Sequence, residues 1–260
     1  ADYFGDRMDF VFRGGNSIQE LMDASWGREF GKATLDNGVI DGSDTGVLLS
    51  GNWAAADFDG VVVNSPNDEG LLMAGSSATS IDGLTVNGGR YGIRMAQPAS
   101  GTLGATNSAL DNQSQDGVVL SKKVNLDLGG IISNSSNAGV NVLSSSTDDW
   151  SFDSLVLEDN NIGLLHSGSG SVTCTDCDTG GNAIDVHTSG TVEWVEGEVD
   201  ITAVTATGSG LFKRARLLDL TITADTVAVA GAGVSLLDGD SRKVANGKTD
   251  ANGVASGMQF

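Results

Sequence analysis

The chain has 260 residues, of which 34 are acidic and 14 basic, giving a formal net charge of −20. Such a surface repels nucleic acid and anionic membranes, so we expect neither as a partner, and no apolar run reaches the roughly 18 residues that a membrane span needs. The 37 glycines beside only 2 prolines indicate many tight turns between regular strands rather than a disordered linker.

The beginning of the chain carries the signature of one short helix. Ser17 followed by Glu20 forms a capping box, a pair that begins many helices. Apolar residues then recur at helical spacing, at Ile18, Leu21, Met22 and Trp26. We therefore predict that residues 1–34 form an N-terminal cap, a strand plus a short amphipathic helix that covers the first strands of the fold.

A repeat follows, in which a glycine precedes a short apolar strand every 20 to 25 residues or so. Its members begin at Gly70, Gly92, Gly117, Gly139, Gly163 and, more loosely, Ala183. Another short strand and a polar turn precede each anchor, as in I-I-S-N over residues 131–134. Short strands at this step are typical of a solenoid, and the serine-rich return segments disfavour the helices of a leucine-rich repeat.

The turns of this repeat are rich in asparagine. Asn87, Asn112 and Asn134 each lie five residues before an anchor glycine. Asparagine tolerates a left-handed backbone and bonds to an equivalent amide on the next turn, so we predict an amide ladder here. Gly139 is expected at a place where a Cβ atom would be crowded, with Val140 and Val142 pointing inward and Asn141 outward.

This pattern resembles the right-handed parallel β-helix repeat of pectate-lyase-like and related surface proteins, over residues 35–228. The resemblance implies an all-β solenoid of about eight coils, stacked at the strand spacing of about 4.8 Å. It implies no single function, because lyases, hydrolases, adhesins and structural stalks all share the fold.

Residues 229–260 have a different pattern, in which Asp-Gly and two Asn-Gly turns separate short strands. Val234 with the stretch 249–253 resembles the first strands of carboxypeptidase-regulatory-like or Ig-like β modules. One interpretation, which we favour, is that the chain is a fragment of a longer surface protein. The others are that these strands form a β-hairpin that closes the last coil, or that they pair with a neighbouring molecule.

The catalytic motifs of the β-helix enzymes are mostly missing. A pectin-type hydrolase would be expected to carry Asn-Thr-Asp, Asp-Asp, Gly-His-Gly and Arg-Ile-Lys, and only Asp148-Asp149 is present. Arg94 could serve a lyase as the base, because it is the middle, outward residue of its strand. Its expected counterparts on the other coils are Leu72, Val119, Asn141, Leu165 and Asp185. These residues predict a partly apolar strip rather than a charged cleft.

If the chain has acid–base chemistry elsewhere, the coil that bears His187 is the candidate. Asp176, Asp178 and Asp185 precede it closely in sequence. The simpler interpretation, which we favour, is that Asp176 and Asp178 shape a turn. The other histidine, His166, falls in the inward column with Met73 and Met95.

Three further residue sets suggest binding. Trp53, Trp150 and Trp194 either stack on sugar rings or fill the core, and the sequence does not separate these alternatives. Acid-rich turns at Asp148, Asp149 and Asp159 are candidates for Ca²⁺, the one cofactor that the sequence suggests, although they match no EF-hand spacing. Cys174 and Cys177 are half of a zinc site without a second half, so we expect a local disulfide or two free thiols.

Together these features predict a non-catalytic extracellular or cell-surface module for structure or adhesion. Its expected partners are a polysaccharide or surface glycan, further copies of itself, or further domains of a longer chain. The alternative is a polysaccharide lyase or glycoside hydrolase that acts along the outward strands.

Overall fold

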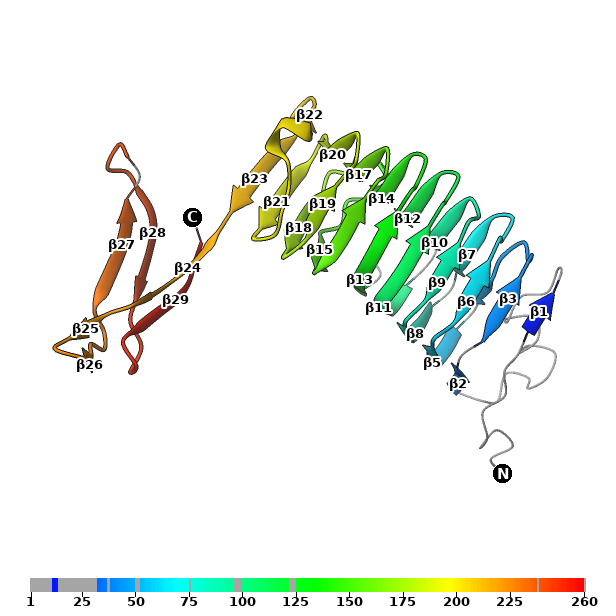
Figure 1. The fold of residues 1–260 in the computed structure, drawn as a ribbon, viewed down its shortest axis with the longest axis horizontal. Helices are drawn as coiled ribbons and strands as arrows, with labels where there is room; N and C mark the ends of the chain where they lie inside the picture. The colour runs from blue at the N-terminus through cyan, green and yellow to red at the C-terminus, as the bar shows by residue number, and fades with distance from the viewer. Residues whose placement is uncertain are drawn as a thin grey trace.

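A computed structural model describes residues 11–13, 32–36, 38–49, 52–74, 76–95, 100–121, 125–237 and 239–259. The protein is all-β, and parallel strands stack into a β-solenoid of about seven turns (Figure 1). The predicted β-helix is therefore confirmed. The predicted helix within residues 17–26 lies outside the described residues, as does most of the predicted cap.

Each coil of the solenoid contributes strands to three faces, which we number in chain order. The first face contains β2 (Lys32–Asp36), β5 (Asn52–Asp59), β8 (Ser76–Asp82), the starts of β11 (Ser100–Asp111) and β13 (Asn125–Ser133), β15 (Trp150–Asp153), β18 (Ser171–Thr175), β21 (Thr191–Val195) and β23 (Leu211–Ala215). The second face contains β1 (Val11–Arg13), β3 (Val39–Asp41), β6 (Val62–Asn64), β9 (Thr85–Asn87), the ends of β11 and β13, β16 (Leu155–Glu158) and β19 (Asp178–Gly180).

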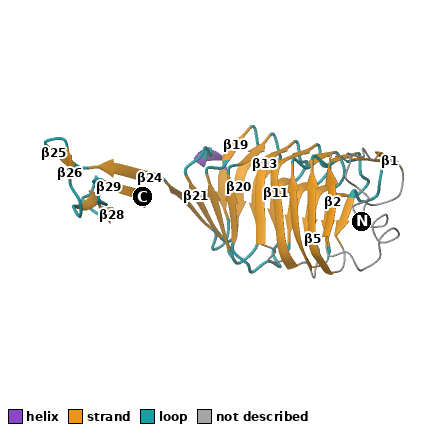
Figure 2. Cartoon of the chain, turned by 90° about the horizontal axis from the view of Figure 1, so that it is seen from below, coloured by secondary structure: helices purple, strands orange, loops and turns teal. Residues whose placement is uncertain are grey.

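The third face is one eight-stranded parallel sheet. It contains β4 (Val47–Leu49), β7 (Glu69–Met73), β10 (Tyr91–Met95), β12 (Asp116–Leu120), β14 (Ala138–Val142), β17 (Ile162–His166), β20 (Ile184–Thr188) and β22 (Val204–Ala206). The one helical element among the described residues is the 3-10 helix η2 (Ile201–Ala203), at the end of the solenoid near β21 (Figure 2).

The anchor glycines are needed where the chain enters the third face. A Cβ atom on Gly139 would lie 2.9 Å from the carbonyl oxygen of Gly163 and 3.0 Å from the Nδ2 atom of Asn160. Gly117 is more crowded, with the Gly139 carbonyl oxygen 2.6 Å away. Successive anchors thus pack against one another, which confirms the predicted reason for glycine at Gly139.

The corner between the second and third faces is a left-handed turn. One residue of each coil there has a φ between 48° and 82°. This column consists of Gly42, Ser65, Gly88, Asn112, Asn134, Asp159 and Gly181, and backbone amides along it bond to carbonyls of the next coil. The left-handed conformation predicted for Asn112 and Asn134 is confirmed, while Asn87 lies one place earlier, beside Gly88.

The predicted amide ladder is only partly correct. Asn87 does donate to Asn64, at 2.9 Å, but Asn112 and Asn134 are exposed, and Asn134 donates to Asp111 of the preceding coil at 2.7 Å. The inward amides occupy the next place along the chain. Asn160 is buried and accepts from the Ser135 amide through Oδ1, at 2.9 Å, while Nδ2 donates to the Ile132 carbonyl. The residue in the left-handed turn points outward, and the residue directly after it points inward. An amide one place later along the chain therefore faces the interior instead of solvent.

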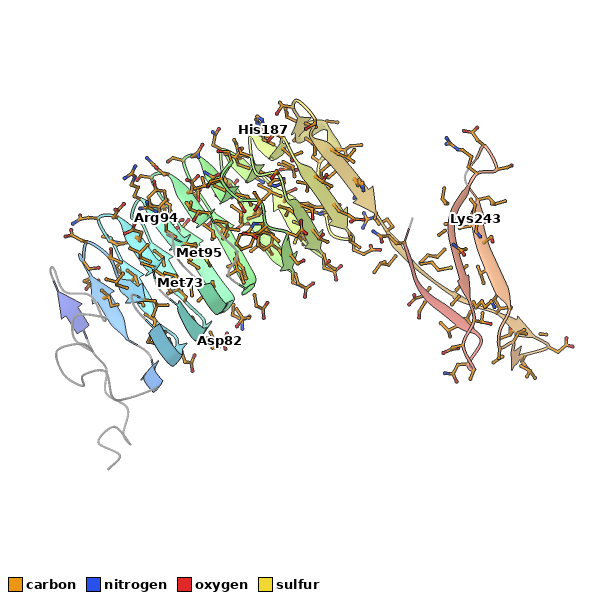
Figure 3. The ribbon with its side chains drawn as sticks, turned by 180° about the vertical axis from the view of Figure 1, so that it is seen from behind. Met73, Asp82, Arg94, Met95, His187 and Lys243 are labelled. Atoms are coloured by element: carbon orange, nitrogen blue, oxygen red, sulfur yellow. The ribbon has the colours of Figure 1, made fainter. Side chains whose placement is uncertain are left out.

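The interior of the solenoid is a continuous apolar column. Val140, Val142, Met73 and Met95 point inward and are buried, as predicted. Met73 and Met95 are labelled in Figure 3. His166 also lies in this column and is fully buried.

Beyond β23 the pairing of strands changes from parallel to antiparallel. β24 (Leu217–Thr221) pairs with β29 (Val254–Gln259), β25 (Thr223–Ala224) with β26 (Val227–Ala228), and β27 (Gly233–Leu237) with β28 (Lys243–Lys248). We call residues 217–259 the C-terminal strands. They enclose a small core of three buried residues, Ala245, Ala255 and Met258. Their predicted likeness to an Ig-like module stays a prediction.

Candidate functional site

The third face carries the outward residue that the sequence singled out, Arg94. The next-to-last residue of each third-face strand belongs to one row, which runs Leu48, Leu72, Arg94, Val119, Asn141, Leu165, His187 and Thr205. The row contains His187 in place of the predicted Asp185, because β20 pairs two residues later than the repeat predicts. The partly apolar character predicted for the strip is retained, since Leu72 and Leu165 are half-buried and Val119 is 5% exposed.

Polar residues gather on neighbouring strands around Arg94, and we call Glu69, Tyr91, Arg94, Asp116 and Asn141 the Arg94 cluster. Arg94 donates to Oε1 of Glu69 at 2.8 Å, and its guanidinium carbon lies 5.1 Å from the centre of the Tyr91 ring. Glu69 is only 3% exposed. A buried carboxylate needs such a partner, because an unpaired charge in this environment is costly.

Asp116 is the second buried carboxylate of the cluster, on the opposite side of Tyr91. Its Oδ1 atom accepts hydrogen bonds from Asn137 Nδ2 at 2.7 Å and from the Ala138 amide at 3.1 Å, and Oδ2 accepts from Asn141 Nδ2 at 3.2 Å. Burial raises the pKa of the Asp116 carboxyl, against the lowering effect of these three hydrogen bonds. Burial therefore favours the protonated form of Asp116 more than these hydrogen bonds oppose it.

The polar groups of the cluster have few free positions for a substrate, because they already bond to one another and to neighbouring coils. Both oxygens of Glu69 are engaged, one by Arg94 and the other by Thr45 Oγ1 at 2.9 Å. Tyr91 donates its hydroxyl proton to Gln115 at 2.7 Å. Every one of these bonds joins one coil to the next. The cluster therefore acts first as a set of cross-links between stacked strands.

The coil of His187 does not assemble the predicted acid–base set. Asp176 is exposed and has a φ of 50°, at the bend between the first and second faces. Asp178 lies on the second face and accepts from the Glu198 amide at 2.8 Å. Asp185 is buried and accepts from Thr179, Asn182 and the Asp200 amide. His187 is half-buried on the third face (Figure 3). The turn-shaping interpretation matches the position of Asp176, whereas Asp178 is the first residue of strand β19.

Two of the three tryptophans fill the core. Trp150 is 4% exposed and Trp194 is fully buried, with its indole N–H donating to the Cys177 carbonyl at 3.1 Å. These two rings have no face open to a sugar, so of the two alternatives that the sequence left open, filling of the core matches the positions of Trp150 and Trp194. The side chain of Trp53 lies outside the described part of the structure.

The calcium candidates do not converge. Asp149 accepts from the Ser171 amide and hydroxyl, each at 2.8 Å, beside the first face. Asp159 is exposed at the corner between the second and third faces, and Asp148 is half-buried before β15. Within the described ranges, no three His, Cys, Asp or Glu side chains form a group that could hold a metal ion.

The interior holds three groups with unusual protonation behaviour. His166 Nδ1 lies 3.2 Å from Thr188 Oγ1, and burial lowers the pKa of its imidazole. Cys174 and Cys177 are free and buried. Burial raises the pKa of Cys174 well above its usual range, while a hydrogen bond from Cys174 lowers the pKa of Cys177. None of the three is exposed to a ligand.

Comparisons with protein-family models, with curated proteins and with solved structures find no match for this chain. In the part of the chain that the structure describes, no helix has the length and apolar character to cross a membrane.

Sequence reasoning missed Glu69, Tyr91 and Asp116. The signal was present, because each of them directly precedes an anchor glycine. Ala138 and Ile162 take the same place on later coils. A polar residue at a repeat position that is apolar on these later coils marks a departure from the packing pattern, and that departure defines the cluster.

Proposed function

We propose that the protein is a non-catalytic structural or adhesion module of an extracellular or cell-surface protein. The observation that carries this proposal is the bonding of the Arg94 cluster. Glu69 and Asp116 have all four carboxylate oxygens engaged by residues of neighbouring coils. A catalytic carboxyl must instead reach a proton of the substrate.

The rest of the described surface supports the same proposal. The acid-rich turns of the other candidate sites hold single carboxylates that bond to nearby backbone amides. A rigid body of stacked strands with a strongly negative surface suits a stalk or spacer that must stay extended and soluble. Any glycan would then be held at the outer surface, without turnover.

A second candidate function is supported by one specific observation, the placement of Asp116 and Glu69 on either side of Tyr91. The two residues are two coils apart, which separates their backbones by roughly 10 Å. Inverting glycoside hydrolases use two carboxyl groups about 6.5–9.5 Å apart, one of them protonated. The raised pKa of Asp116 would suit it for the acid. Arg94 would then sit between the two.

A panel of acidic and neutral polysaccharides, with and without Ca²⁺, tests both candidates. We expect no shortened or unsaturated products, and either retention of a glycan or none. Product release that is lost in Asp116→Asn but kept in Asp127→Asn would replace the proposal with the hydrolase. Asp127 is the matched control because it is exposed on the first face.

A further inference from the structure

The charge of the chain is divided unevenly along its length. Residues 1–210 contain 29 acidic and 8 basic residues, whereas residues 211–260 contain 5 acidic and 6 basic residues. Residues 1–210 therefore carry more than the whole net negative charge of the protein. The last coil and the C-terminal strands together are close to neutral, with a slight positive excess.

The second face presents an apolar stripe to solvent. One outward residue from each of six successive coils lies in register, and all but a threonine are apolar. The stripe consists of Val39, Val62, Thr85, Ala109, Ile131 and Val156. Ile131 is 44% exposed and Ala109 is also exposed, while the residues that follow each of them, Leu110 and Ile132, are buried. At the strand spacing the stripe is roughly 24 Å long.

Carboxylates border this stripe on both sides. On the corner toward the third face, the register places Asp41, Asp111 and Glu158 in one line with intervening amides and a serine. On the corner toward the first face, Asp59 and Asp82 are exposed and adjacent. The stripe with these two acidic borders is the second-face surface. Asp59 and Glu158 lie on opposite borders, toward opposite ends of the stripe. The surface therefore suits a partner that is apolar in the middle and basic at both ends.

The hairpin of β27 and β28 has the complementary chemistry. Val234, Leu236 and Ala245 lie on its inner side, against the small core. Its other side exposes Leu237 by 54% and Val244 by 42%. Lys243 and Lys248 are exposed at the two ends of β28, and neither has an ion-pair partner among the described residues. Six residues of strand span roughly 20 Å, close to the length of the stripe.

One copy does not use these two surfaces together. Figure 3 shows Asp82 on the solenoid and Lys243 on the hairpin well separated from each other. We propose that the hairpin of one copy docks on the second-face surface of a second copy. The apolar residues Leu237 and Val244 would cover the region around Ile131, and the two lysines would face the acidic borders.

Such a contact joins different surfaces of identical chains. After two copies have joined, each still has one unused surface, so further copies can add. The contact therefore builds head-to-tail chains, which are open unless the rotation between copies closes a ring. The inference rests on the proposed function, and it specifies a second copy of this chain as the partner of the module. The attraction between exposed charges should weaken with salt, since the Debye length is about 3 Å in 1 M NaCl.

Sedimentation velocity over a range of protein concentrations tests the proposal. The parent chain should associate in low salt, and at least tenfold more weakly in 1 M NaCl. A hairpin variant, Lys243→Glu with Lys248→Glu, and a border variant, Asp59→Lys with Glu158→Lys, should each associate at least tenfold more weakly. Among the described residues, the carboxylates of Asp59 and Glu158 have no hydrogen-bond or ion-pair partner, so the border variant should keep the fold.

Charge exchange distinguishes a specific contact from general repulsion. An equal mixture of the hairpin and border variants should associate again, because each presents the charges that the other needs. Lys213→Glu and Asp127→Lys change the same charges on the first face and should leave the association of the parent unchanged.

A parent chain that stays monomeric, or variants that associate as the parent does, would overturn the inference. Neither result would touch the proposed function, which fails only if the polysaccharide panel gives products.

Discussion

The solenoid and the C-terminal strands are both built from short β-strands, but they are stabilised in different ways. In the solenoid each coil pairs with coils before and after it, and one apolar core runs from Ile40 to Val199. In the C-terminal strands pairing is antiparallel and the buried core is three residues. Large exposed apolar residues are frequent from Ile201 onward, and Ile131 is the one earlier example among the described residues.

A repeated coil therefore constrains its sequence more strongly than a hairpin does. Every position inside the solenoid has a neighbour about 4.8 Å above and below, so an unsuitable side chain disturbs three coils together. A hairpin constrains mainly its turn and one side. Substitutions should therefore be costly at repeat positions and mild at comparable positions of the C-terminal strands.

The largest expected effect comes from a charge in the centre of the solenoid. Val140 is fully buried on β14. Val140→Asp should cost about 5 kcal/mol or more and abolish cooperative unfolding, because the carboxylate has no partner there. Circular dichroism during thermal unfolding measures this, with Val140→Ala as the smaller change. A melting curve like that of the parent would show that the coil assignment is wrong.

A medium effect is expected at the anchor glycines. In Gly117→Ala the new methyl group would meet the Ile132 side chain and the Gly139 carbonyl, so we expect a loss of about 3 kcal/mol. Two glycines provide controls, Gly180 in the solenoid and Gly233 in the C-terminal strands, because a Cβ atom on either would have no neighbour within 4 Å. Alanine at either should change the unfolding free energy little, as chemical denaturation would measure. Equal losses at all three glycines would remove the distinction between crowded and open positions.

The smallest effect concerns pH and belongs to the solenoid alone. Burial lowers the pKa of His166, so the unfolded chain takes up its proton more readily than the folded chain does. The stability that neutral His166 provides is therefore present above the unfolded pKa of about 6.5 and is lost as the pH falls below it. His166→Met should flatten the change in melting temperature between pH 7 and pH 5.

Asp116 is the control for this pH dependence, because its effect has the opposite sign. Its raised pKa means that the folded chain holds this proton more tightly, so its contribution declines as the pH rises above 3.8. Asp116→Asn should therefore not flatten the decline below pH 6.5. If His166→Met leaves that decline unchanged, another group causes it.

The fold could be predicted from the sequence because glycine, asparagine and apolar residues recur with the coil. A left-handed turn at Asn134 and a crowded glycine at Gly139 are local requirements, and local requirements are visible in the residue type. The inward positions of Val140 and Val142 follow from simple alternation.

The register of the last coils could not be predicted in the same way. Shifting β20 by two residues leaves every side chain on the same side of the sheet, so Asp185 and His187 fit the alternation equally well. In the observed register Asp185 is buried and accepts hydrogen bonds from Thr179 and Asn182, and these are tertiary contacts. The same limit applies to the Arg94 cluster, whose members meet across several coils. The burial of Trp150 and Trp194 likewise depends on tertiary contacts, namely on which residues of the neighbouring coils lie beside them.

The repeat of the anchor glycines also means that the length of the solenoid is set by the number of its coils. Asp116 is in register with Ala138, and each coil contacts mainly the coils beside it. Removing residues 117–138 would join Asp116 directly to Gly139 and bring β10 against the remainder of β14. The solenoid would then be shorter by one strand spacing with the other coils intact. Its reach can thus change in steps of about 4.8 Å, by the gain or loss of whole coils, without redesign of either end.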